Sequence, residues 1–167
     1  MSKSLVVRKR RRLECKTDYL ARENLLKNNS RIVFRKTNRY IIAQLVLSSQ
    51  AQDSTKVGLT SKKLFEYGWP STSRGSLKSL PASYFTGYLL GKKMLDLEIK
   101  ESVLDLGLTR NIKKSRVYAF LKGLLDSGVK INHKEDVFPD DTRLRGRHLK
   151  SSLEFDKIKS AIDKKFV

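Results

Sequence analysis

Residues 31–46 read RIVFRKTNRYIIAQLV, and this stretch decides the kind of fold that the chain is expected to adopt. Two runs rich in β-branched and aromatic residues, 32–34 and 40–46, flank a short polar cluster. Runs of this composition, separated by a few polar residues, predict two antiparallel strands joined by a tight connection. The polar residues at the crest of this hairpin include three cations: Arg35, Lys36 and Arg39. A hairpin does not need three positive charges, so a negatively charged partner is the first hypothesis and a solvated tip is the alternative.

The rest of the chain extends this hairpin into an α/β fold. The short loop after the second run allows only an antiparallel third strand, whereas the long connection through the Pro81 helix allows a parallel crossover. The expected strands after the hairpin are 55–61 and 101–108, and the expected helices are 17–29 with Thr17 as its cap, 61–68, 81–99, 115–128 and 154–166. These elements predict a small mixed sheet, an antiparallel meander plus one crossover strand, covered by helices.

The charge of the chain is large and unevenly distributed. The 167 residues carry a formal net charge of +19, and residues 1–40 alone hold 13 Lys and Arg against 3 Asp and Glu. A protein with this much self-repulsion is expected to have a polyanionic partner. The pattern predicts three parts: an extended basic N-terminal arm at 1–16, an α/β domain at 17–131 that binds the polyanion, and an extended C-terminal segment at 132–167 with a terminal helix.

Two stretches of the chain resemble ligand-binding motifs, one for phosphate and one for a metal ion. The stretch GYLLGKK at 87–93 fails as a phosphate-binding loop because its glycines are too close together, and Gly87 and Gly91 are expected to let a helix lie close to a strand. The acidic loop 135–141 could hold Mg²⁺, although adjacent acids in such a loop are usually solvated. No zinc-ligand spacing, cofactor motif or membrane-spanning run is present, and Cys15 is the single cysteine, which fits a cytoplasmic, non-enzymatic protein.

One known family shares a series of stretches with this chain. The most specific are RKTNRYIIAQ and YFTGYLLGKK, and they are accompanied in order by VLDLGL, SRVYAFLKGLLDSGV and DDTRLRGRHL. From about Lys9 to Leu149 the chain resembles the archaeal type of the universal large-subunit ribosomal protein number eighteen, the carrier of 5S rRNA. The resemblance implies a structural protein of the central protuberance that contacts 5S rRNA, contacts 23S rRNA through the arm, and adjoins ribosomal proteins such as number five.

The resemblance also implies which residues face RNA. They are Lys9, Arg10, Arg11, Arg12 and Lys16 in the arm, Arg35, Lys36, Thr37, Asn38, Arg39 and Tyr40 at the hairpin, and then Ser61, Lys62, Trp69 and Arg74. Trp69 could equally stack on a base or pack in the core. The chain departs from the family at Lys114, where a Gly is expected before SRV, so that turn is expected to be built differently and to be more basic.

Two other functions stay open on the sequence alone. One is an Mg²⁺-dependent RNA-processing enzyme that uses the acidic loop, and the other is a general nucleic-acid-compacting protein. An enzyme would lose activity when Asp140 and Asp141 become Asn, and a compacting protein would bind duplex DNA as well as folded RNA.

Overall fold

The sheet of this protein has four strands in the order β3-β2-β1-β4. The computed structural model describes residues 10–50, 52–71, 76–147 and 154–166. Strands β1 to β3 form an antiparallel meander, and β4 pairs with β1 in parallel. The strand bounds are β1 Ser30–Lys36, β2 Ile41–Ser49, β3 Gln52–Thr60 and β4 Val103–Asp105. The predicted mixed sheet, with its meander and its crossover strand, is confirmed.

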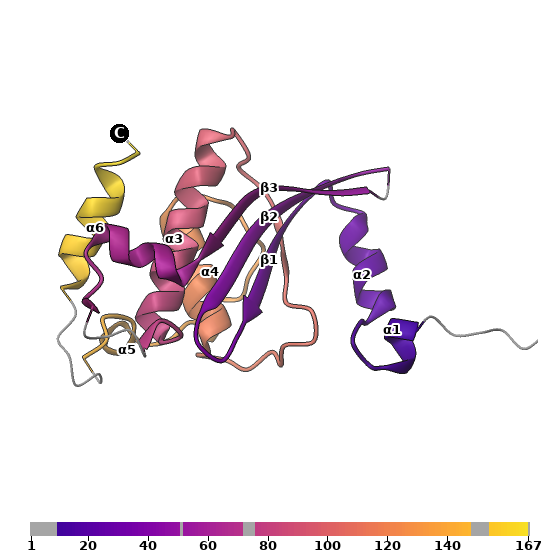
Figure 1. The fold of residues 1–167 in the computed structure, drawn as a ribbon, viewed down its shortest axis with the longest axis horizontal. Helices are drawn as coiled ribbons and strands as arrows, with labels where there is room; N and C mark the ends of the chain where they lie inside the picture. The colour runs from indigo at the N-terminus through magenta and orange to yellow at the C-terminus, as the bar shows by residue number, and fades with distance from the viewer. Residues whose placement is uncertain (1–9, 51, 72–75, 148–153, 167) are drawn as a thin grey trace, which may run out of the picture.

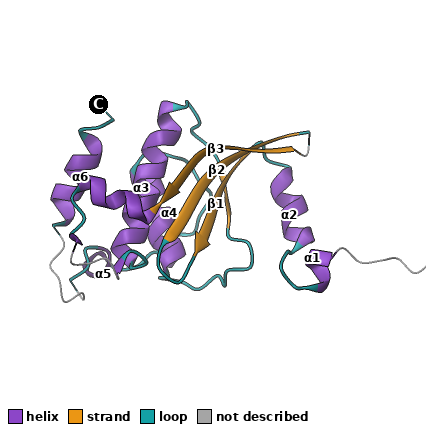
Figure 2. Cartoon of the chain, in the orientation of Figure 1, coloured by secondary structure: helices purple, strands orange, loops and turns teal. Residues whose placement is uncertain are grey.

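Two long helices pack together and cover one face of this sheet (Figure 2). Helix α3 contacts β2 and β3, and helix α4 reaches β1, where the Phe120 and Phe34 ring centroids lie 5.0 Å apart. Helices α1 and α2 lie at the end of the sheet where β1 begins (Figure 1). The helix bounds are α1 Arg10–Leu13, α2 Tyr19–Leu26, α3 Leu80–Asp96, α4 Arg116–Asp126, α5 Asp141–Leu144 and α6 Phe155–Asp163, with 3-10 helices η1 Ser61–Tyr67 and η3 Glu135–Val137.

The core follows from the alternation of side chains along β1. Ile32 and Phe34 have no exposed surface, and they point toward α3 and α4 because successive side chains of a strand face opposite sides. Helix α3 is buried on almost every side, since it contacts the sheet, η1, α4 and α5. Its first turn contains Pro81, as predicted, and is capped by Ser79, whose hydroxyl accepts a hydrogen bond from the Ala82 N–H.

The expectation for the glycines of α3 was half wrong. They do permit a close approach, but to α4 and not to a strand. A Cβ on Gly87 would lie 2.2 Å from the Phe120 carbonyl oxygen, and a Cβ on Gly91 would lie 1.8 Å from Ser127 Oγ. Spacing along a helix predicts that something comes close, but it cannot say which element does.

The cap of helix α2 also differs from the prediction. Asp18, and not Thr17, caps α2, since its carboxylate accepts hydrogen bonds from the N–H groups of Leu20 and Ala21 at 3.0 and 3.1 Å. Both residue types favour this position, so the sequence could not separate two neighbours. The expected helix at 61–68 is the 3-10 helix η1, which Gly68 ends in the left-handed conformation.

Candidate nucleic-acid interface

The hairpin crest, defined as residues 36–40, joins β1 to β2 through a turn that Thr37 closes. The Thr37 N–H and hydroxyl donate to the Tyr40 carbonyl oxygen at 2.9 and 2.7 Å, and the Tyr40 N–H donates to Thr37 Oγ1 at 2.9 Å. Lys36, Asn38 and Arg39 are exposed. Within the described part of the chain, neither Lys36 nor Arg39 has a carboxylate partner. Two cations therefore remain available to an anion at a turn of defined shape.

Arg35, the third predicted crest cation, has a structural role in this fold. Its guanidinium donates to the Phe34 and Asp105 carbonyl oxygens at 2.8 and 2.9 Å and pairs with the Asp105 carboxylate at 3.1 Å. The group also lies against Gly107, where an added Cβ would be 2.9 Å from Arg35 Cζ. Arg35 thus joins β1 to the end of β4, and its charge is largely neutralised.

The remaining predicted residues near the hairpin divide into a surface pair and two buried side chains. Lys62 is exposed, and its ammonium lies 4.5 Å from the centroid of the half-buried Tyr40 ring. Ser61 has no exposed surface, and its hydroxyl accepts a hydrogen bond from the Ile41 N–H at 3.1 Å. Trp69 is only 3% exposed and meets the Phe85 ring edge to face at 6.5 Å. Ser61 and Trp69 therefore pack in the core, and Trp69 is not placed to stack on a base.

The described part of the predicted arm is a single helical turn, although no regular structure was expected there. Arg10 and Lys16 both pair with Glu14, at 3.2 and 2.7 Å, and Arg11 Nε donates to Thr17 Oγ1 at 2.9 Å. The Arg10–Glu14 pair has the i,i+4 spacing that supports a helical turn. Arg12 is exposed. Lys9 and Arg74 lie outside the described residues, so their roles stay predictions.

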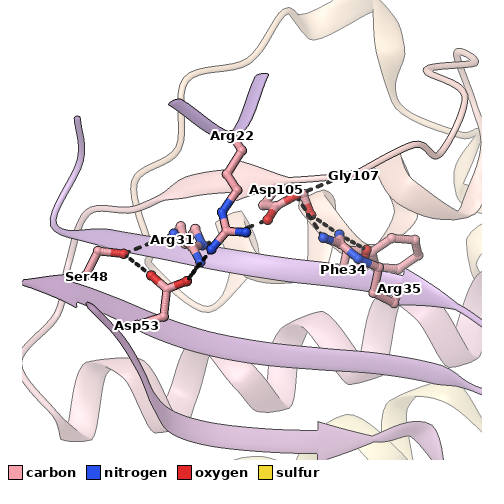
Figure 3. A network of polar contacts seen from close by, with 8 residues as sticks. All are labelled: Arg22, Arg31, Phe34, Arg35, Ser48, Asp53, Asp105 and Gly107. Carbon is pink, nitrogen blue, oxygen red and sulfur yellow. Dashed lines mark hydrogen bonds and ion pairs between the residues drawn. The ribbon is translucent and has the colours of Figure 1, made fainter. Parts of the chain in front are cut away.

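The face of the sheet opposite α3 and α4 carries an ionic network that the sequence reasoning missed (Figure 3). Arg31 is 7% exposed and contacts Asp53 at 2.5 Å, and Asp53 also accepts a hydrogen bond from the Ser48 hydroxyl at 2.6 Å. Arg22 of α2 reaches the same carboxylate at 3.6 Å. The hydrogen bonds from Arg31 and then Ser48 hold the pKa of Asp53 below its usual range. The signal available was the alternation Arg31-Val33-Arg35, which places cations on one face of β1.

Among its described residues, the acidic loop is part of no metal-binding group. The part of the chain that the structure describes contains no group of three or more His, Cys, Asp or Glu side chains able to hold a metal ion. Asp140 instead pairs with Lys114 Nζ at 2.9 Å. No helix within the described ranges has both the length and the apolar content needed to cross a membrane.

The fold and the surface charge define a class of protein: a basic α/β domain with exposed crest cations that no described carboxylate neutralises. Residues 3–101 match the family described as "Ribosomal large subunit proteins 60S L5, and 50S L18". The chain is 40% identical to "Large ribosomal subunit protein uL18" of Korarchaeum cryptofilum over 161 residues, which cover 96% of this chain and 80% of that protein. It is 43% identical over 150 residues to the protein of the same name from Methanothrix thermoacetophila, covering 89% of this chain and 86% of the relative.

A third relative with the same name is also similar to most of this chain. The "Large ribosomal subunit protein uL18" of Methanoculleus marisnigri is 45% identical over 141 residues, which cover 84% of this chain and 78% of the relative. The chain belongs to the uL18 family of large-subunit ribosomal proteins. Family membership implies a structural, non-enzymatic component of the large ribosomal subunit, with ribosomal RNA and ribosomal proteins as its partners.

Proposed function

We propose that this ribosomal protein binds 5S rRNA and helps to attach it to 23S rRNA in the central protuberance of the large subunit. The observation that carries the proposal is the hairpin crest. Lys36 and Arg39 are exposed and have no carboxylate partner among the described residues, on a turn whose shape is held by Thr37. Cations held at fixed positions can recognise the phosphate pattern of a folded RNA, whereas cations on a flexible chain bind any polyanion.

The proposed division of the chain assigns separate contacts to its parts. Residues 17–131 form the domain that holds 5S rRNA, and residues 1–16 form a basic arm that reaches 23S rRNA. Arg10, Arg11 and Arg12 are consecutive and exposed at the described end of this arm. Segments of this composition order when they bind RNA, since phosphates remove the repulsion between the cations. Ribosomal protein number five completes the proposed set of partners. Residues 132–167 form the third part of the chain, and Leu144, Ile158 and Ile162 of this part pack in the core.

The experiment that tests the proposal is binding of the purified protein to 5S rRNA from the same organism across a salt series, with tRNA and duplex DNA as competitors. Neutralisation of about six to ten phosphates predicts a slope of roughly −5 to −9 in a plot of log K against log salt. The proposal expects 5S rRNA to remain the preferred ligand at high salt. Equal competition by all three polyanions would contradict it and would favour a nucleic-acid-compacting protein.

A double variant tests whether the hairpin crest contacts the RNA. Lys36→Ala/Arg39→Ala is expected to reduce the slope by about 2, because two phosphate contacts are lost. Lys56→Ala/Lys164→Ala removes the same charge from β3 and from the residue after α6, where both lysines are exposed. If the two variants bind equally, the crest is not the recognition surface.

A further inference from the structure

A second group of cations lines a surface groove beside the hairpin crest. The lining residues come from the end of β1, the start of α3, the loop 109–115, the start of α4 and helix α5. The charged residues of this cationic groove are Lys36, Arg110, Lys114, Arg116 and Arg143. No Asp or Glu is among the described residues that line it. The groove therefore concentrates positive charge from four segments of the chain at one place.

Most of these charges are not neutralised by the protein. Lys114 pairs with Asp140 at 2.9 Å. The other four, Lys36, Arg110, Arg116 and Arg143, have no ion pair or side-chain hydrogen bond within the described part of the chain. Like charges that converge without counterions destabilise the isolated domain, so the arrangement indicates a bound anion.

The turn at Lys114 brings the parts of the groove together. Lys114 has a φ of +57°, a conformation that favours Gly, which accounts for the Gly expected at this position. Its N–H donates to the Val137 carbonyl oxygen at 2.8 Å, and its side chain reaches Asp140. These two contacts join the loop before α4 to the segment before α5 and so place Arg143 beside Arg110 and Arg116.

The arrangement of the groove suits the repeated charge of a phosphodiester backbone. Its four unpaired cations come from four separate segments of the chain, and three of them are arginines, whose planar guanidinium can bind two phosphate oxygens at once. Ser115 is the N-cap of α4 by position but makes no side-chain hydrogen bond to the first turn, so no side-chain cap competes with an anion for the N–H groups of that turn. Ile112, at 59% exposed, adds an apolar surface on which the sugar and base of a nucleotide can rest.

We propose that the cationic groove binds a backbone segment of ribosomal RNA and extends the contact that begins at the hairpin crest. Lys36 belongs to both surfaces, so one RNA strand can follow them without interruption. This inference rests on the proposed function, because it assigns further phosphate contacts to the same RNA-binding face. The proposed phosphate-binding residues outside the crest are Arg110, Arg116 and Arg143.

The test measures binding of the full chain to 5S rRNA and, separately, to 23S rRNA across a salt series. The groove variant is Arg110→Gln/Arg116→Gln/Arg143→Gln, which retains much of each side chain's length. Its matched control, Lys56→Gln/Lys100→Gln/Lys164→Gln, removes three exposed charges that do not line the groove. Loss of three phosphate contacts reduces the slope of log K against log salt by about 2 to 3. The affinity of the groove variant is therefore closer to that of wild type at high salt, and the difference in affinity narrows by about 15- to 60-fold between about 50 and about 200 mM salt. Thermal unfolding verifies that each variant is folded. If the half-buried Arg116 is needed for folding, the double variant Arg110→Gln/Arg143→Gln replaces the triple variant, because both of its positions are exposed.

The outcomes separate this inference from the proposed function. If the groove variant matches its control on both RNAs while the crest variant weakens binding, the groove inference is wrong and the proposed function stands. If neither variant differs from its control, the groove inference is wrong and the crest is not the recognition surface, and the competition between 5S rRNA, tRNA and duplex DNA decides the proposed function separately. If labelled poly-L-glutamate binds wild type as tightly as RNA does and binds the groove variant more weakly, the groove takes an acidic protein segment, and the RNA inference is overturned.

Discussion

Replacing Gly87 by Ala tests how closely α3 and α4 pack. The added Cβ would lie 2.2 Å from the Phe120 carbonyl oxygen, whereas ordinary contact begins near 3.4 Å, so the helices must separate by about 1 Å. A gap of that size forfeits roughly a quarter to a half of the dispersion energy of each contact across the interface. Ala favours the helix by about 1 kcal/mol, which offsets only part of this loss. We expect a net destabilisation of about 2 to 4 kcal/mol.

The assay is thermal and urea unfolding of wild type, Gly87→Ala and two comparison variants. For a chain of this length the loss corresponds to a fall in Tm of about 4 to 16 °C. Gly123→Ala is expected to behave alike, since its Cβ would lie 2.1 Å from the Tyr84 carbonyl oxygen across the same interface. Gly58→Ala, with nothing within 4 Å, should stay within about 0.5 kcal/mol of wild type. A Gly87→Ala protein as stable as wild type would refute the reasoning.

Three further predictions concern the ionic network, the turn and the core. The hydrogen bond from Arg31 is the main reason why the pKa of Asp53 is lowered in the folded state. The Asp53 carboxylate therefore stabilises the folded protein fully above the unfolded pKa of about 4, and this stabilisation is lost as the pH falls through the folded pKa. Asp53→Asn should therefore lower stability at neutral pH and flatten the decline in acid, as urea unfolding at several pH values would reveal. Lys114→Gly should leave the free energy of unfolding unchanged or raise it by up to about 1 kcal/mol, because the backbone strain relieved at a φ of +57° is at least as large as the energy of the exposed ion pair with Asp140 that is lost. Lys114→Val should lower the free energy of unfolding, because a β-branched residue is strained at this φ. Trp69, at 3% exposed, should show blue-shifted fluorescence that acrylamide quenches poorly, and this emission should not change when RNA binds; strong quenching would contradict its core position.

The hairpin and the sheet were predictable because their signals are local. The runs at 32–34 and 40–46 carry the composition of strands, and the register that pairs Lys36 with Ile41 places the polar residues at the crest. The helices α3 and α4 were also predictable, since α4 has a periodic apolar face, α3 has a proline in its first turn, and each follows a serine, a residue type favoured at the N-cap.

The candidate site was predictable only in part. The exposed crest cations Lys36 and Arg39 followed from the sequence, whereas the burial of Ser61 and Trp69 did not. Ser61 begins an expected helix and Trp69 begins a stretch whose composition favours a loop, and neither position indicates burial; tertiary packing decided it. The groove residues were missed because Arg110, Arg116 and Arg143 have no spacing that marks them as one group.

The sequence by itself determined the strand and helix segments, the excess of positive charge and its concentration toward the N-terminus, since each depends on residues close together in the chain. Only the tertiary structure decided which cations are neutralised and which are free. Arg35 meets Asp105 across 70 positions of sequence, and the turn at Lys114 brings Arg143 to the start of α4. The energy of a charge depends on its neighbours in space within a few ångströms, and the fold, not the order of residues, sets those neighbours.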